Sequence, residues 1–130
     1  DAVVSPGGFG VAKNFFDYAL NGVNCAVDAQ IELLIKNIHK AGKPIGALCI
    51  APVLLTKVLK NIVVTIGNDE NTAKDVAKMG GKNINTVSGE VISDKENKIY
   101  STPCYMLEAN IKDIHDCAYN LISTMLENME

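Results

Sequence analysis

Residues 46–55 read Gly-Ala-Leu-Cys-Ile-Ala-Pro-Val-Leu-Leu, and this stretch decides how the chain folds. The apolar residues before Cys49 are typical of a buried strand, and Pro52 suits the first turn of a helix, where its missing N–H costs nothing. Cys49 then lies on a tight turn between strand and helix, as the reactive residue of a nucleophile elbow does. Such a turn requires small residues two positions before and after it, and Ala47 and Ala51 meet that requirement.

An elbow cysteine sits over the N-terminus of the following helix, whose unpaired N–H groups and dipole favour the thiolate. The alternative is that Cys49 is a small buried apolar side chain, as most cysteines in strands are. The small flanking residues and Pro52 together favour the elbow.

A glycine-rich turn follows a second strand near the start of the chain. Residues 1–5 predict an apolar strand of the kind that has neighbours on both sides in a parallel sheet, and residues 6–10 read Pro-Gly-Gly-Phe-Gly. This turn and Cys49 lie at the same carboxyl edge of the sheet, where ligands of open α/β folds bind. Backbone amides of the turn can therefore join the Ile50 amide as an oxyanion site. Taken alone, Gly8-x-Gly10 is an ordinary tight turn, and no nucleotide-binding glycine motif is present.

The rest of the chain alternates helix and strand patterns, which predicts an α/β fold with a mainly parallel sheet. We expect helices at residues 27–41, 68–80 (capped by Asn68 or Asp69) and 106–129, strands at 44–48 and 61–66, and a hairpin at 90–102 that turns through 94–97. The helix at 27–41 should direct Ile31, Leu34, Ile35 and Ile38 inward and stop at Gly42. The last helix should bury Leu107, Ile111, Ile114, Ala118, Leu121, Ile122 and Met125.

The charge balance argues against a nucleic-acid partner. The chain has 12 basic and 15 acidic residues and a net charge of −3, the wrong sign for a protein that binds phosphate backbones. All the basic residues are lysine, so no guanidinium can contact phosphate or guanine in a bidentate way. No apolar run reaches the ~18–20 residues of a membrane span. We expect neither a nucleic-acid nor a membrane partner.

The cysteines and histidines restrict the chemistry further. Cys25, Cys49, Cys104 and Cys117 lie in apolar periodic segments without a CxxC motif, which favours reduced thiols in a cytoplasmic protein. His39 and His115 have no metal-ligand spacing, so we expect no metal. His39 precedes the strand whose far end carries Cys49, roughly 15 Å away, so no Cys–His dyad is visible. The connection at Thr102, Pro103 and Tyr105 can line a pocket or be a plain link.

Four segments together resemble the ElbB-type (enhancing lycopene biosynthesis) glyoxalase-like proteins of the ThiJ/PfpI superfamily. They are residues 3–14 (VVSPGGFGVAKN), 42–46 (GKPIG), 49–52 (CIAP) and 101–107 (STPCYML). The resemblance implies a flavodoxin-like three-layer sandwich of the class I glutamine amidotransferase type. It also implies that residues 1–130 form the C-terminal portion of one domain, whose N-terminal strands are absent and would carry a Glu that contacts the thiol. The lack of an initiator Met agrees with this expectation.

The same resemblance implies an activity and its residues. Cys49 would be the catalytic nucleophile of a cofactor-independent glyoxalase that converts glyoxal to glycolate, with Gly7, Gly8 and Ile50 binding the oxyanion or substrate. A homodimer and a link to isoprenoid biosynthesis are implied as well. Glutaminases of this fold have a downstream His-x-Glu and its peptidases a His after the cysteine. This chain has neither, so both activities are disfavoured.

One departure from the family pattern weakens the case for strong catalysis. The deglycase relatives have a His near residues 66–68, where this chain reads Ile-Gly-Asn. Two alternatives to the glyoxalase therefore stay open. An elbow thiol can also serve as a non-catalytic redox sensor or regulatory contact, because thiolates oxidise readily. Finally, the likeness can be one of fold alone, since one fold hosts many activities.

Overall fold

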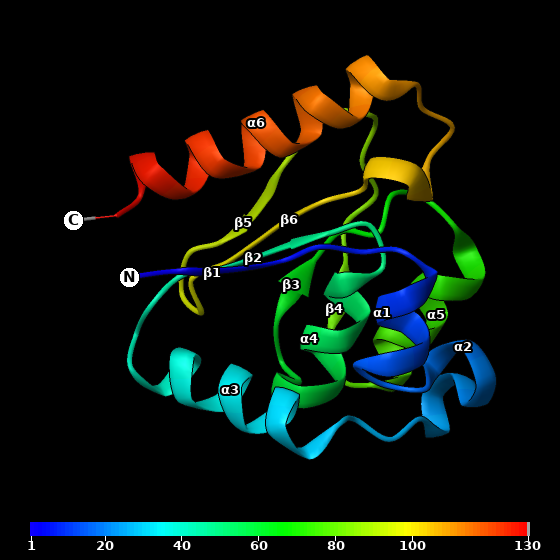
Figure 1. Cartoon of the computed structure of the whole chain (residues 1–130). Helices are drawn as coiled ribbons and strands as arrows, with labels where there is room; N and C mark the ends of the chain where they lie inside the picture. The colour runs from blue at the N-terminus through cyan, green and yellow to red at the C-terminus, as the bar shows by residue number, and fades with distance from the viewer. Residues whose placement is uncertain (130) are drawn as a thin grey trace.

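The structure is a computed structural model that describes residues 1–129. Helices and strands are interspersed along the chain, and the start of β1 and the end of α6 lie on the same side of the molecule (Figure 1). The elements are β1 (Val3–Ser5), α1 (Phe9–Asn14), α2 (Tyr18–Asn21), η1 (Gly22–Asn24), α3 (Ala29–Lys40), β2 (Ile45–Leu48), α4 (Ala51–Leu59), β3 (Val63–Val64), α5 (Glu70–Lys78), β4 (Lys82–Asn83), β5 (Ile92–Asp94), β6 (Ile99–Thr102), η2 (Cys104–Met106) and α6 (Ile111–Glu127).

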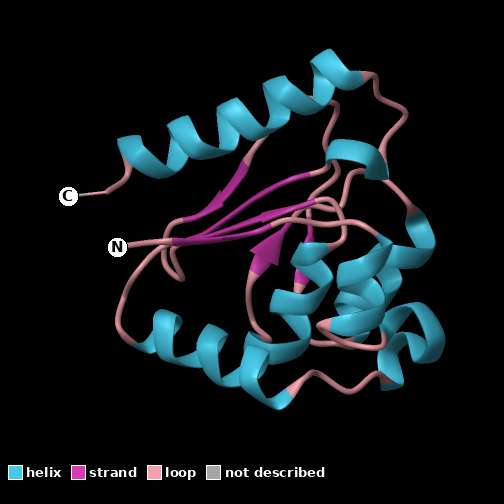
Figure 2. Cartoon of the chain, in the orientation of Figure 1, coloured by secondary structure: helices cyan, strands magenta, loops and turns pink. Residues whose placement is uncertain are grey.

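Four strands form the central sheet in the order β1-β2-β6-β5. β1, β2 and β6 run parallel, and β5 pairs antiparallel with β6 as the predicted hairpin. α6 covers one face of this sheet, and the α-helices α1 to α5 lie on the opposite face (Figures 1 and 2). The three-layer α/β architecture predicted from the sequence is therefore confirmed.

A second, two-stranded parallel sheet of β3 and β4 extends the central one. Side chains join the two sheets: the Val63 amide donates to Asp94 Oδ2 at 2.8 Å, and the Thr65 amide donates to Ser101 Oγ at 2.9 Å. Because side-chain oxygens replace carbonyls here, only two residues of the predicted strand at 61–66 form a ladder. β4 was not predicted.

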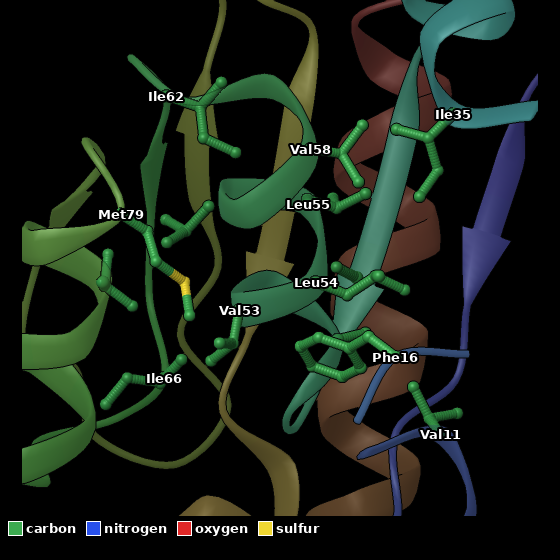
Figure 3. Close-up of a cluster of buried hydrophobic side chains, with 14 of the residues drawn as sticks. Val11, Phe16, Ile35, Val53, Leu54, Leu55, Val58, Ile62, Ile66 and Met79 are labelled. Carbon is green, nitrogen blue, oxygen red and sulfur yellow. The ribbon is translucent and has the colours of Figure 1, made fainter. Parts of the chain in front are cut away.

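The main hydrophobic core is built around α4. Its side chains lie between those of Phe16 and Ile35 on one side and those of Ile62, Ile66 and Met79 on the other (Figure 3). A helix that is apolar all round must be buried on all sides, and α4 is buried at nearly every position from its start. The core thus fixes the N-terminus of α4, and with it the turn that carries Cys49.

The last helix differs from the prediction at its start. Asn110 caps α6: its side chain accepts from the Asp113 amide at 2.9 Å, and Asp113 Oδ2 accepts from the Asn110 amide at 3.0 Å. This capping box starts the helix at Ile111 rather than at 106, and Leu107 instead packs against Gly67 in the preceding connection.

The buried stripe of α6 is also narrower than predicted. Cys117, Leu121 and Met125 recur every four residues and are buried against the sheet. Ile111 and Ile122 are rotated away from this stripe, and their exposed fractions are 82% and 40%. The prediction that they point inward is wrong.

One further expectation needs correction. In α3, Ile35 is buried, but Leu34 is 47% exposed although it was expected to face the core. β1 pairs with β2 alone among the described strands, and Val4 is 38% exposed, so the second neighbour expected for this strand is not among residues 1–129. No helix in the part of the chain that the structure describes has both the length and the apolar character needed to cross a bilayer.

Candidate active site

Cys49 occupies the turn between β2 and α4, with a φ of 61°. This left-handed conformation costs a non-glycine residue about 1–2 kcal/mol, so the surrounding structure must hold it. The Cys49 amide donates to the Thr102 carbonyl at 3.1 Å, which continues the hydrogen bonding of β2 to β6 by one residue. Ile50 then caps α4, and Pro52 lies in its first turn. The local geometry is that of a nucleophile elbow.

Small residues make this turn sterically feasible. Ala47 and Ala51, two positions before and after Cys49, are fully buried. Gly7 approaches from the β1 turn: a Cβ on it would lie 2.4 Å from Cys49 Cβ and 2.7 Å from the Leu48 carbonyl oxygen. Only a residue without a side chain fits against the elbow at this distance.

Cys49 borders two cavities with largely apolar walls. One, of about 310 Å³, is lined by Gly8, Phe9, Ala12, Tyr18, Ala19, Cys49, Ile50 and Met106. The other, of about 320 Å³, is lined by Pro6, Gly7, Gly8, Leu48, Cys49, Cys104, Tyr105 and Ile114. Each is large enough for a small organic molecule beside the thiol.

Backbone amides near the thiol are available for an oxygen ligand. Within residues 1–129, neither the Gly8 nor the Ile50 amide donates a hydrogen bond to another group. Both residues line the cavity of about 310 Å³ together with Cys49. Gly8 has a φ of 96°, a conformation that a glycine adopts without strain. The arrangement offers donors of the type that stabilise an oxyanion.

The three residues expected as pocket lining are placed differently from one another. Tyr105 is 59% exposed and lines the cavity of about 320 Å³. Thr102 and Pro103 are buried and are not among the residues that line either cavity. Thr102 instead fixes the position of the elbow: its carbonyl accepts a hydrogen bond from the Cys49 amide, and its hydroxyl donates to the Glu90 carbonyl at 2.8 Å.

A second thiol shares the site. Cys104 follows β6, is 3% exposed and lines the same cavity as Cys49 and Tyr105. Burial raises the pKa of Cys104 to about 12, and the neighbouring thiols of Cys117 and Cys49 add to this effect. Cys104 is therefore a neutral thiol at physiological pH. Cys25 lies elsewhere in the core, where burial raises its pKa as well.

No acid–base partner for Cys49 lines these cavities among the described residues, whose side chains there include no histidine, lysine or carboxylate. His39 is near the C-terminus of α3, and His115 is on the exposed side of α6, with Nδ1 3.5 Å from Asp116 Oδ1. Within residues 1–129 no group of three potential ligands is placed to hold a metal ion.

Sequence reasoning missed several lining residues, among them Phe9, Tyr18, Met106 and Ile114. Tyr18 comes from α2 and is fixed by a hydrogen bond from its hydroxyl to Asp75 Oδ2 at 2.6 Å. The two residues are 57 positions apart in sequence, so no local sequence pattern predicts this contact. Met106 and Ile114 were assigned to one continuous helix, which concealed the connection that turns toward Cys49.

The chain is similar in sequence to known proteins over almost its whole length. It is 38% identical over 98% of its residues to human "glutamine amidotransferase-like class 1 domain-containing protein 3, mitochondrial", and equally similar to the "ES1 protein homolog, mitochondrial" of Rattus norvegicus. The chain spans 51% of each relative, about half of its length. No protein-family model matches the chain.

Solved structures show the same architecture. An "isoprenoid biosynthesis protein with amidotransferase-like domain" from Ehrlichia chaffeensis superposes over the whole chain with a TM-score of 0.90 and 31% identity, and the chain covers 60% of it. DJ-1beta of Drosophila melanogaster, at 16% identity and a TM-score of 0.56, shares the fold. The chain is thus related to glutamine amidotransferase-like class 1 domain proteins and has a flavodoxin-like α/β fold.

Proposed function

We propose that this chain carries the nucleophile of an ElbB-type, cysteine-dependent glyoxalase that converts small reactive carbonyls, glyoxal to glycolate, without an added cofactor. The observation that carries the proposal is the strained elbow: Cys49, at φ 61°, is held against Gly7 and opens onto cavities beside the free amides of Gly8 and Ile50. The similarity to amidotransferase-like proteins supports a nucleophilic role for an elbow residue in this fold.

In the proposed reaction, the Cys49 thiolate adds to an aldehyde carbon and forms a hemithioacetal. The Gly8 and Ile50 amides hold the resulting oxyanion. A base must then move a proton from the carbon that carries the sulfur to the second carbonyl carbon, which turns the hemithioacetal into a glycolyl thioester on Cys49. Hydrolysis of this thioester releases glycolate and restores the Cys49 thiol. The described cavity walls supply no such base. We propose that a Glu from an N-terminal segment of the same protein supplies it.

The assembly and cellular setting are part of this proposal. We propose that residues 1–130 are the C-terminal portion of one domain and that the complete protein is a cytoplasmic homodimer with no nucleic-acid or membrane partner. The relatives named above are mitochondrial by name, so cell fractionation tests the proposed location directly. A connection to isoprenoid biosynthesis rests on the name of the Ehrlichia chaffeensis protein.

Consumption of glyoxal by the natural full-length protein tests the function. Wild-type protein should form glycolate, and Cys49→Ala should lose this activity, while Cys25→Ala, at a buried thiol outside both cavities, should retain it. Equal rates for wild type and Cys49→Ala would refute the glyoxalase.

A second candidate function is a redox sensor or regulatory protein that acts through Cys49 without turnover. The absence of histidine, lysine and carboxylate side chains from the described cavity walls favours it, because these groups most often move the proton in carbonyl chemistry. Full-length protein that consumes no glyoxal but loses the Cys49 thiol to dilute peroxide before the Cys25 thiol would favour the sensor.

A further inference from the structure

Cys49 and Cys104 lie at the ends of two neighbouring parallel strands. In the register of β2 and β6, Leu48 is opposite Thr102, so Cys49 follows this pair by one residue and Cys104 by two. The hydrogen bond from the Cys49 amide to the Thr102 carbonyl, at 3.1 Å, keeps the two chains together beyond the last paired residues. The two cysteines therefore lie at the same edge of the sheet on neighbouring segments, offset from each other by one residue.

Both residues line the cavity of about 320 Å³, and both are free cysteines. Cys104 also has a left-handed backbone, with a φ of 47°, so both cysteines adopt a conformation that non-glycine residues rarely adopt. Residues held in this way cluster at functional sites, where the surrounding structure fixes them. The neighbouring thiol of Cys117, which is fully buried on α6, adds to the effect of burial in raising the pKa of Cys104.

We propose that Cys49 and Cys104 form a redox-active pair, in which a hydroperoxide oxidises Cys49 and Cys104 resolves the product as an intramolecular disulfide. In the first step the Cys49 thiolate attacks a peroxide oxygen, the O–O bond breaks, and Cys49 becomes a sulfenic acid while hydroxide or alkoxide leaves. In the second step the Cys104 sulfur attacks the Cys49 sulfur, the S–OH bond breaks, and the Cys104 proton leaves with the hydroxyl as water. The peroxide is reduced by two electrons and the two thiols are oxidised by two.

The surroundings of the pair explain why resolution is favoured over further oxidation. Cys104 shares a cavity with the sulfenic acid, so its attack is intramolecular, whereas a second peroxide must enter from solution. Because Cys104 is buried and protonated, it does not compete for the first peroxide and still supplies the proton for water. Cys25 lines neither cavity and is excluded as a partner.

Peptide mapping after oxidation tests the pair in the full-length protein. The wild type is treated with one equivalent of hydrogen peroxide, its remaining thiols are alkylated, and the unreduced digest is analysed by mass spectrometry. We expect a peptide pair linked through Cys49 and Cys104, with Cys25 fully alkylated. A linkage of Cys104 to Cys117, a disulfide between two molecules, or Cys49 recovered as sulfinic acid with Cys104 alkylated would each overturn the proposal.

Two variants sharpen the test, and the wild-type map stands even if either fails to fold. Cys104→Ser should abolish the disulfide and convert Cys49 to sulfinic acid at the same dose of peroxide. Cys25→Ser, the matched control at another buried cysteine, should form the disulfide as the wild type does. Unchanged sulfinic acid yield in Cys104→Ser would contradict a resolving role. No carbonyl substrate is present, so the outcome is independent of the proposed glyoxalase.

Discussion

Gly7 touches Cys49 so closely that a methyl group on Gly7 would lie 2.4 Å from the Cβ of Cys49 and 3.1 Å from the Ile50 amide nitrogen. These neighbours are backbone atoms and the first atom of a side chain, so none can swing aside. The β1 turn and the elbow are therefore fitted to each other, and the position of the thiol depends on a residue that is 42 positions away in sequence.

Gly7→Ala should displace the elbow and destabilise the fold. Overpacking of this kind costs about 1–3 kcal/mol. We expect a corresponding decrease in the free energy of unfolding by urea and, in the full-length protein, a slower reaction of Cys49 with a thiol reagent. Gly10→Ala is the matched control three residues later, in α1, where a Cβ meets nothing within 4 Å. The free energy of unfolding of Gly10→Ala should rise by up to about 1 kcal/mol, because alanine is favoured over glycine inside a helix. Equal effects at the two positions would contradict the close contact.

The backbone strain at Cys49 predicts an unusual order of two substitutions. At φ 61° glycine avoids the cost that any Cβ carries, so Cys49→Gly should be more stable than Cys49→Ala by about 1 kcal/mol. Denaturant unfolding of the two variants measures this difference, and both lack the thiol, which cancels its contribution.

Cys25 provides the reference, because it is also buried but has an ordinary φ of −63°. Here glycine only adds freedom to the unfolded chain, and Cys25→Gly should be less stable than Cys25→Ala by about 0.5–1 kcal/mol. The same order of stability at both positions would mean that the elbow stores no strain.

The elbow could be predicted from sequence because its requirements are local. A strand that turns directly into a helix leaves room only for small residues, and Ala47 and Ala51 are small. Pro52 marks the first turn of the helix, so all three signals lie within six positions of the sequence. The start of α6 could not be predicted from hydrophobic spacing, since Leu107 and Ile111 continue the helical period through the connection. Only the reciprocal bonds of Asn110 and Asp113 show which residue starts the helix.

The cavity-lining residues Tyr18 and Cys104 are placed by contacts between segments that are distant in sequence. Tyr18 reaches the cavity because Asp75, on α5, binds its hydroxyl, and Cys104 reaches it because β6 lies beside β2. Neither residue is part of a motif with Cys49. Sheet order and helix placement bring them together, and these follow from the packing of the whole core around α4.

Tyr18 should make stability fall at alkaline pH. Burial, and next the hydrogen bond and charge of Asp75, raise the pKa of Tyr18 above its ordinary value of 10.0. A group whose pKa is higher in the folded state adds stability that is complete below the unfolded pKa and is lost as the pH rises through the folded one. The contribution of Tyr18 to the free energy of unfolding should therefore decline above about pH 10, the unfolded value.

Tyr18→Phe removes this titration and should flatten the decline. Burial also raises the pKa values of Tyr100, Cys25 and Cys104, so part of the slope should survive in the variant. Tyr119→Phe, at a ring that is 65% exposed on α6, serves as the control and should follow the wild-type curve. Urea unfolding at a series of pH values compares the three proteins. A slope in Tyr18→Phe as steep as that of the wild type would show that Tyr18 does not titrate with unfolding.

Gly46 and Met125 should be energetically coupled across the face of the sheet that α6 covers. A Cβ on Gly46 would lie 2.6 Å from Met125 Sδ, and Met125 is 3% exposed. Gly46→Ala forces this side chain to move, and we expect a loss of about 1–3 kcal/mol in the free energy of unfolding. Met125→Ala leaves a cavity and should cost about 2–5 kcal/mol.

In the double variant the new methyl group occupies part of the space that Met125 vacates, so the two losses should not add. We expect the double variant to be more stable than the sum of the single changes predicts by about 0.5–3 kcal/mol. Pairing Gly46→Ala with Met79→Ala is the control, since Met79 is buried in the core on the opposite face of the sheet and should give additive losses. Additivity in both pairs would mean that α6 does not pack on β2 at Gly46.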